Sequence, residues 1–372
     1  MSQKSANNFN YVLTSFNHFK SSLLKHTKYK VLLLPLFLII QNIATAQIFT
    51  INKKQFFNEE QPIEMTLTTD FRKLYAEKQK KDNKLYAQPA SITCIFYDSI
   101  KVTEEIEIRP RGEFRREQCS MTPVMLNFKA TKSNTLKKLG KLKLVWPCET
   151  STYYEQLVLK EYLVYKIYNL LTEKSFKVRL VRIATQDSKE KYKPLLFFAF
   201  FIEDVDDMAS RNNCKEMQEV KLHTEQTNRK QTTLLSLFEY MIGNTDWAIP
   251  LNRNVKLIVN KKDSLQDPFA IPYDFDYCGL VNAEYAIPPP ELEIVSVRSR
   301  LYRGFARNME ELQEALQIFH NKKAAIDSLI TNCKALSGSN KKEMIDYINE
   351  FYKSVDNDKK IKYLFIDHAR KQ

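Results

Sequence analysis

Glycine and histidine are scarce in this chain, which has six glycines and five histidines among 372 residues. Three of the histidines, His223, His320 and His368, follow residue 46, and no two cysteines form a Cys-x-x-Cys pair. Structural zinc sites need closely spaced cysteine and histidine ligands, so we expect none here. The small number of glycines also disfavours a glycine-rich loop around phosphate groups.

The sequence also lacks an apolar run of the ~20 residues that a membrane-spanning helix requires. Its most apolar stretch, residues 31–40 (VLLLPLFLII), is half that length and contains Pro35. Five lysines and no acidic residue precede this stretch, and Ala44-Thr45-Ala46 follows it. A charged region, an apolar core and small residues at a cleavage point are typical of a secretory signal. We therefore expect residues 1–46 to be a signal peptide, with an uncleaved anchor as the alternative.

Export would place the rest of the chain in the periplasm, outside the cell or at the cell surface, with no transmembrane segment after cleavage. All six cysteines lie beyond residue 46, and an even number is compatible with disulfides in an oxidising compartment. Cys119 and Cys148 flank a predicted pair of strands, so we expect this pair to form a bridge. The alternative is that most of the cysteines are buried free thiols.

The formal net charge is +13, and removing the five leader lysines leaves about +8. Such a balance suits nucleic acid, an anionic membrane or a phosphorylated ligand. The lysines are scattered, however, and no nucleic-acid-binding motif accompanies them. We therefore expect no nucleic-acid partner and a mostly solvated basic surface. The cluster of Arg298, Arg300 and Arg303 belongs to that surface, and an acidic substrate is its alternative partner.

Residues 232–283 contain the most informative pattern of the chain. Apolar residues between positions 234 and 242 recur at helical spacing, so they form one face of a helix. Gly243 stands where a left-handed cap would end that helix. Asp246 is therefore expected on a loop that a buried helix holds in place.

Two short strands are predicted after this loop, at residues 255–259 and 269–273. Asn254 precedes the first strand, and Asp274 and Asp276 follow the second. In an extended chain, side chains two positions apart point to the same face. Two carboxylates with an amide oxygen suit Mg²⁺ or Mn²⁺, with phosphate oxygens as further ligands.

The N-terminal half offers groups that suit an anion. The sequence RPRGEFRR, residues 109–116, directly follows a predicted strand. Its Arg111 and Gly112 place a guanidinium group and an open backbone where phosphate oxygens can approach. A turn with surface arginines is the alternative.

A predicted helix at residues 153–171 carries Glu161 within its apolar face. Burial of a carboxylate is costly unless a partner meets it. A lysine is one candidate for that partner, and Arg179 or Arg182 in the next predicted strand is the other.

The order of these elements resembles a known family. RPRGEFRR, the helix with LKEYLVYKIYNLL, GNTD followed by Asn254, and PYDFD are similar in order and spacing to the CotH-type spore-coat kinases, which are atypical protein kinases. The resemblance extends over about residues 106–304. It implies that Asp246 accepts the proton of an acceptor hydroxyl, that Asp274 binds the metal ion, and that Asn254 and Asp276 are auxiliary metal ligands.

The resemblance also implies how ATP is held. Arg111 and Gly112 would cover the nucleotide, and a lysine positioned by Glu161 would bind its phosphates. Lys143 is the preferred lysine because it lies just before the helix, and Lys129 competes with it. The family's own lysine position, shortly after the Arg-Gly element, is occupied here by Pro123-Val124-Met125.

We therefore predict an α+β, two-lobed, atypical protein-kinase-like fold. Residues 47–205 would form an N-terminal lobe with a mostly antiparallel sheet and one key helix, and residues 206–372 a mostly helical C-terminal lobe. The predicted activity is transfer of phosphate from ATP, with Mg²⁺ or Mn²⁺, to a hydroxyl of a protein or a surface polymer. The alternatives are an exported binding or structural protein without transfer activity and a metal-dependent phosphoester hydrolase.

Overall fold

The structure is a computed structural model that describes residues 51–76, 86–96, 100–112, 114–133, 135–218, 220–263 and 265–371. These residues belong to one unit that spans residues 50–372. The predicted signal peptide lies outside the described residues.

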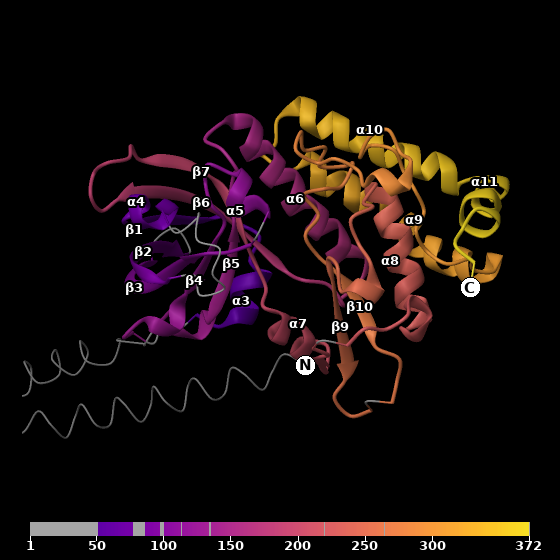
Figure 1. Ribbon diagram of the computed structural model, residues 1–372, viewed down its shortest axis with the longest axis horizontal. Coiled ribbons are helices and arrows are strands. Elements are labelled where there is room, and N and C mark those ends of the chain that lie inside the picture. The colour runs from indigo at the N-terminus through magenta and orange to yellow at the C-terminus, as the bar shows by residue number, and fades with distance from the viewer. Residues whose placement is uncertain are drawn as a thin grey trace, which may run out of the picture. The chain divides into compact units, whose positions relative to one another are not determined.

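Seven strands form a closed barrel in the order β1-β2-β3-β4-β5-β7-β6 (Figure 1). Neighbouring strands pair antiparallel, except that β1 pairs parallel to β6, with Ile63 opposite Val181. Alternate residues of β1 and β2 are buried, as expected when one face of each strand lines a barrel interior. The strands are β1 (Ile63–Thr69), β2 (Gln88–Phe96), β3 (Ile100–Pro110), β4 (Val124–Asn127), β5 (Lys141–Val145), β6 (Val178–Asp187) and β7 (Leu195–Ile202).

Closure of this sheet contradicts the predicted two-lobed, kinase-like fold. Alternation of apolar and polar residues predicts where strands lie, but it does not identify the partner of each edge strand. The pairing that closes the barrel joins β1 to β6, which are far apart in the sequence. The chain therefore combines a closed β-barrel with helices in its C-terminal region.

Helices α7 to α11 follow the last barrel strand in the sequence, and α8, α9 and α10 are the longest of these five (Figure 1). The predicted domain boundary at residues 205 and 206 falls at the start of α7 and stays a prediction. The helices are α3 (Lys53–Asn58), α4 (Phe71–Ala76), α5 (Phe114–Gln118), α6 (Thr152–Leu171), α7 (Val205–Arg211), α8 (Arg229–Ile242), α9 (Met309–Thr331), α10 (Gly338–Val355) and α11 (Asp358–Lys362).

Helix α6 links the barrel to the C-terminal helices. It contacts β6 and β7 on one side and α9 on the other. Ser151 begins the helix by accepting a hydrogen bond from the backbone of Tyr154 at 3.4 Å, which satisfies one of the free donors of the first turn. Tyr165 and Tyr168 are fully buried within it. The helix is apolar on most of its surface because it is covered from both sides.

A second, three-stranded sheet carries the predicted hairpin. Its order is β10-β9-β8, with β8 (Cys214–Glu216), β9 (Val255–Asn260) and β10 (Phe269–Pro272). The two strands predicted at residues 255–259 and 269–273 are therefore confirmed, and they pair antiparallel. Strand β8 was not predicted, because it is three residues long and carries little pattern.

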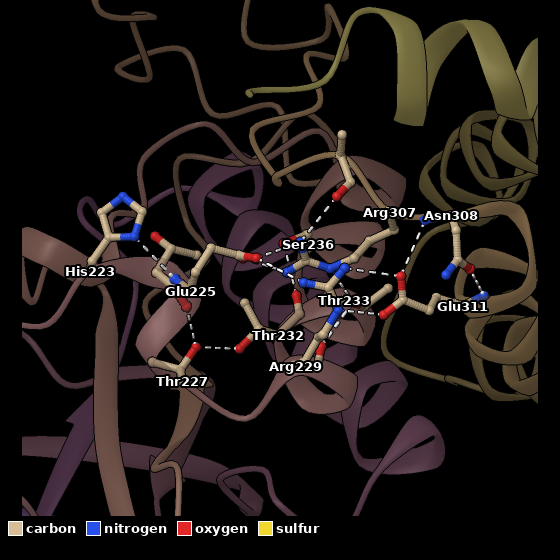
Figure 2. A network of polar contacts seen from close by, with 12 residues as sticks. His223, Glu225, Thr227, Arg229, Thr232, Thr233, Ser236, Arg307, Asn308 and Glu311 are labelled. Atoms are coloured by element: carbon tan, nitrogen blue, oxygen red, sulfur yellow. Dashed lines mark hydrogen bonds and ion pairs between the residues drawn. The ribbon is translucent and has the colours of Figure 1, made fainter. Parts of the chain in front are cut away.

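A network of polar contacts joins the start of α8 to the start of α9 (Figure 2). Arg307 is buried and binds Glu225 at 2.6 and 3.0 Å and the Thr233 hydroxyl at 2.9 Å. Arg229 contacts both Glu225 and Glu311. Because a buried guanidinium group must be paired, these bonds fix the segment just before α9 against α8.

The predicted bridge between Cys119 and Cys148 is confirmed as a disulfide, with a Cα–Cα distance of 4.6 Å. It ties the end of α5 to the segment that precedes α6, where the backbone N–H of Met121 also donates to the carbonyl of Cys148. Among the described residues, no helix has both the length and the apolar character needed to cross a membrane.

Candidate active site

Two acidic loops are held side by side at the centre of the candidate site. Helix α8 ends at Gly243, whose φ of 67° is left-handed, as the sequence predicted. The backbone N–H groups of Gly279 and Leu280 donate to the carbonyls of Gly243 and Ile242 at 3.1 and 2.9 Å. These bonds join the loop that carries Asp246 to the loop that carries Asp274 and Asp276.

Asp246 and Asn254 are brought together by direct hydrogen bonds. The Asn254 side-chain NH₂ donates to the Asp246 carbonyl at 2.7 Å and to its carboxylate at 2.9 Å. The other carboxylate oxygen lies 3.5 Å from the Arg253 guanidinium group. Burial raises the pKa of Asp246, while Arg253 and Asn254 oppose that rise by stabilising the charged form.

Asp274 is anchored to helix α6. Its backbone N–H donates to the Tyr165 hydroxyl at 2.8 Å. Its φ is 64°, so the expectation of an extended chain at this point is wrong. This left-handed residue closely follows β10, which ends at Pro272.

Asp276 is buried beside Asp274. The Tyr285 hydroxyl donates to its carboxylate at 3.1 Å. Burial, and then the charge of Asp274, raise the pKa of Asp276 to about 6. Asp246 adds to the same effect, which places all three carboxylates within electrostatic reach of one another.

Glu161 is 2% exposed, as its place in the apolar face of the helix predicts. Its cationic partner is Arg115 of α5, with 4.0 Å between Nη1 and Oε2. Neither candidate from the sequence, a lysine or a strand arginine, was Arg115. The other Glu161 oxygen, Oε1, has no hydrogen-bond partner among the described residues.

The surroundings of Glu161 are strongly charged. Burial raises the pKa of this carboxyl well above its usual range, and the charges of Asp276 and Asp274 raise it further, against Arg115 and Arg111. Arg115 also donates from Nη2 to the Trp146 carbonyl at 3.0 Å. The Arg115–Glu161 pair therefore joins α5 to α6 behind the acidic loops.

Arg111 and Gly112 lie directly after β3. The Arg111 backbone is fixed by a 2.8 Å bond from its N–H to the Pro123 carbonyl. Burial lowers the pKa of the Arg111 guanidinium, and the charges of Asp274 and Glu161 oppose this change. Gly112 has a φ of 72° and open space where a side chain would begin.

Lys143 lies on β5, between Met125 of β4 and Ile202 of β7. Burial and the neighbouring Arg111 lower the pKa of its amine, and Asp274 opposes them. The competing Lys129 is exposed on a short turn. Of the two, Lys143 is the one near the acidic loops, because its Nζ lies 5.4 Å from the centre of the ring of Tyr273, the residue before Asp274.

A small cavity of about 130 Å³ opens beside Lys143. This volume is below that of a pocket for a whole drug-sized ligand, so it would hold only part of a nucleotide. Its lining residues are Met125, Lys141, Lys143, Phe176, Ile202, Glu203, Asp204, Val205, Glu216, Lys256 and Tyr273.

The donor atoms of the site fit a hard cation that keeps water or phosphate ligands. Within the described ranges, no three His, Cys, Asp or Glu side chains are grouped so as to hold a metal ion by themselves. Asp274 and Asp276 offer carboxylates, and Asn254 keeps Oδ1 for a ligand because its NH₂ is used by Asp246. Mg²⁺ in proteins is commonly held by one or two carboxylates plus phosphate oxygens.

Comparison with solved structures gives a weak likeness. No protein-family model matches the chain, and no curated protein matches it. Among solved structures, the crystal structure of a Helicobacter pylori proinflammatory kinase, CtkA, is similar over 77% of this chain and 95% of that chain, with 12% sequence identity and a TM-score of 0.35. The likeness is to a kinase, but it is too low to support an argument about the site. The resemblance to CotH-type kinases stays a prediction.

Proposed function

We propose that this protein binds a nucleoside triphosphate with Mg²⁺ or Mn²⁺ and transfers the terminal phosphoryl group to a hydroxyl of an acceptor. The observation that carries the proposal is that Asp246, Asn254 and Lys143 all lie against the chain at Tyr273 and Asp274. The Tyr273 N–H donates to the Asn254 carbonyl at 3.0 Å, the Asn254 NH₂ donates to the Asp246 carboxylate at 2.9 Å, and Lys143 Nζ lies 5.4 Å from the centre of the Tyr273 ring. A site with cations on one side and carboxylates on the other suits a phosphate chain with a bridging metal ion.

Each residue has a defined part in such a reaction. Arg111 and Lys143 bind phosphate oxygens, and the Arg115–Glu161 pair positions the helix behind them. Asp274, Asp276 and Asn254 hold the cation, which when bound neutralises charge on the transferred group. Asp246 orients the acceptor hydroxyl and accepts its proton, and its raised pKa brings it nearer to the pH of the reaction.

The proposal places the protein outside the cytosol. The disulfide between Cys119 and Cys148 supports this placement, because such bonds persist in oxidising compartments. The acceptor there would be a protein or a surface polymer.

One observation favours a second candidate, a binding protein without transfer activity. Both oxygens of the Asp246 carboxylate already face partners, Asn254 on one side and Arg253 on the other. While Arg253 stays in place, it competes with an acceptor hydroxyl for that carboxylate.

The test is incubation of the purified protein with γ-labelled ATP and Mg²⁺ or Mn²⁺, followed by measurement of label in the protein and in hydroxyl-bearing peptides. Asp246→Asn should reduce incorporation by about 10²-fold or more, since it removes the proton acceptor and keeps the size of the side chain. Asp267→Asn, at an exposed position, is the matched control and should transfer at the wild-type rate. Nucleotide binding without any incorporation by the wild type would favour the binding protein.

A further inference from the structure

Two arginines lie beside Asp246, and a third is bound to the segment that carries one of them. Arg253 is the nearest, with Nη1 3.5 Å from the Asp246 carboxylate, and its side chain is 54% exposed. An ion pair of this length and exposure contributes only about 0–1 kcal/mol. Arg253 is therefore held loosely and can turn towards another anion.

Arg303 holds the backbone on both sides of Asp246. Its Nη1 donates to the Trp247 carbonyl at 3.0 Å and also to the Thr245 carbonyl. No acceptor among the described residues uses its Nε or Nη2. The guanidinium group thus fixes the loop with one nitrogen and leaves two for a ligand.

The position of Arg303 is rigid because its segment is anchored a few residues further on. The buried Arg307 binds Glu225 and Thr233 (Figure 2). Phe305 packs against the His223 ring at 5.2 Å between centroids. These contacts hold residues 303–307 in a fixed position.

The backbone of Arg370 is hydrogen-bonded to the same segment, residues 303–307. The Ala306 N–H donates to the Arg370 carbonyl at 2.9 Å, and the Arg370 N–H donates to the Gly304 carbonyl at 3.2 Å. The exposed guanidinium group lies 4.8 Å from the centre of the Phe305 ring.

Arg303 lies within electrostatic reach of both other guanidinium groups. Burial, then Arg370, lower the pKa of Arg303, and Arg253 adds to this, while Asp246 and Glu291 oppose it. Two unused nitrogens on Arg303 and the exposed side chains of Arg253 and Arg370 form a cluster of like charge that indicates a site for an anion.

We infer that the acceptor is an acidic peptide, in which carboxylates flank the hydroxyl that receives the phosphoryl group. This inference rests on the proposed function and names its substrate class. The exposed Leu251, on the turn that leads to Arg253, offers an apolar contact to a side chain of the peptide. Carboxylates of the peptide draw Arg253 away from Asp246, which frees the Asp246 carboxylate for the acceptor hydroxyl.

The first experiment measures peptide binding without nucleotide. Fluorescence anisotropy compares a labelled serine peptide flanked by glutamates with the same peptide flanked by lysines. We expect the acidic peptide to bind at least tenfold more tightly at low salt, and the preference to shrink as salt screens the charges. Equal binding, or tighter binding of the basic peptide, would overturn the inference.

Charge-reversal variants locate the binding surface. Arg253→Glu combined with Arg370→Glu changes two exposed side chains and should abolish or reverse the preference. Lys138→Glu combined with Lys322→Glu makes the same change in net charge at exposed positions elsewhere and should keep it. Circular dichroism melting verifies that both proteins are folded. A preference that survives in the arginine variant, or that is lost equally in the lysine variant, would show that these arginines do not bind the peptide.

Transfer measured with the same two peptides separates this inference from the proposed function. If the wild type phosphorylates the basic peptide as well as the acidic one, the inference fails and the proposed activity stands. If it phosphorylates neither peptide but binds the acidic one through the arginines, the transfer activity fails and the acidic-peptide site stands.

Discussion

Replacement of Glu239 by glutamine should stabilise the protein in a strongly pH-dependent manner. Glu239 lies in α8, is 1% exposed and is surrounded by apolar side chains of the helix core. Burial raises the pKa of its carboxyl from 4.5 to about 8, and the nearby Asp246 adds to the rise, whereas Asn244 and Arg303 oppose it. At neutral pH the folded protein therefore keeps Glu239 protonated.

The size of the effect follows from the two pKa values. The unfolded chain releases the Glu239 proton near pH 4.5, and the folded chain retains it up to about pH 8. The stabilising contribution of the bound proton is thus fully present below pH 4.5 and is lost as the pH rises to 8. The whole loss is about 5 kcal/mol, and glutamine, which stays neutral, avoids it.

Urea denaturation of the wild type and Glu239→Gln at pH 5 and pH 8 measures this difference. We expect similar stability at pH 5 and an advantage of at least about 2 kcal/mol for the variant at pH 8. Glu105→Gln, an exposed position on β3, serves as the control and should show no pH-dependent gain. An advantage for Glu239→Gln that does not change with pH would refute the reasoning.

Three further changes test the packing around the site, each by urea denaturation. Arg115→Met leaves Glu161 buried without its cation and should lower the free energy of unfolding by about 3 kcal/mol at pH 8. Adding Glu161→Gln should recover most of that loss. A loss that the second change does not recover would contradict the pairing. Cys119→Ser, with its partner cysteine also replaced, should cost about 2–4 kcal/mol, and unchanged stability would contradict a disulfide. Gly243→Ala should lower the free energy of unfolding by at least about 1 kcal/mol, because the left-handed backbone disfavours a side chain and the new methyl group would collide with the Tyr347 hydroxyl. Adding Tyr347→Phe should recover part of this loss. No recovery would contradict the collision.

Much of the local structure around the site follows from local sequence patterns. The helix predicted at residues 153–171 is α6 (Thr152–Leu171), and the predicted hairpin is β9 with β10. The burial of Glu161 and the left-handed Gly243 follow from helical spacing and from the conformational freedom of glycine. In each case the signal lies within a few residues of the feature that it predicts.

The features that were missed depend on contacts between distant residues. Closure of the barrel by β1 and β6 leaves no local pattern, so the predicted two-lobed fold was wrong. The partner of Glu161 was missed because Arg115 looked like one of several surface arginines. The left-handed backbone of Asp274 is stabilised by the Tyr165 hydroxyl of α6, which no spacing rule places beside it.

The most direct test of the central claim is a titration of nucleotide binding by calorimetry or thermal shift, with ATP in the presence and absence of Mg²⁺. For the wild type we predict that ATP stabilises the protein only with the cation, by about 2.7 kcal/mol at a hundredfold excess over the dissociation constant. Asp274→Asn tolerates the left-handed backbone and should lose at least tenfold in cation-dependent affinity. Undiminished cation-dependent binding by Asp274→Asn, or no binding of nucleotide by the wild type, would contradict the account.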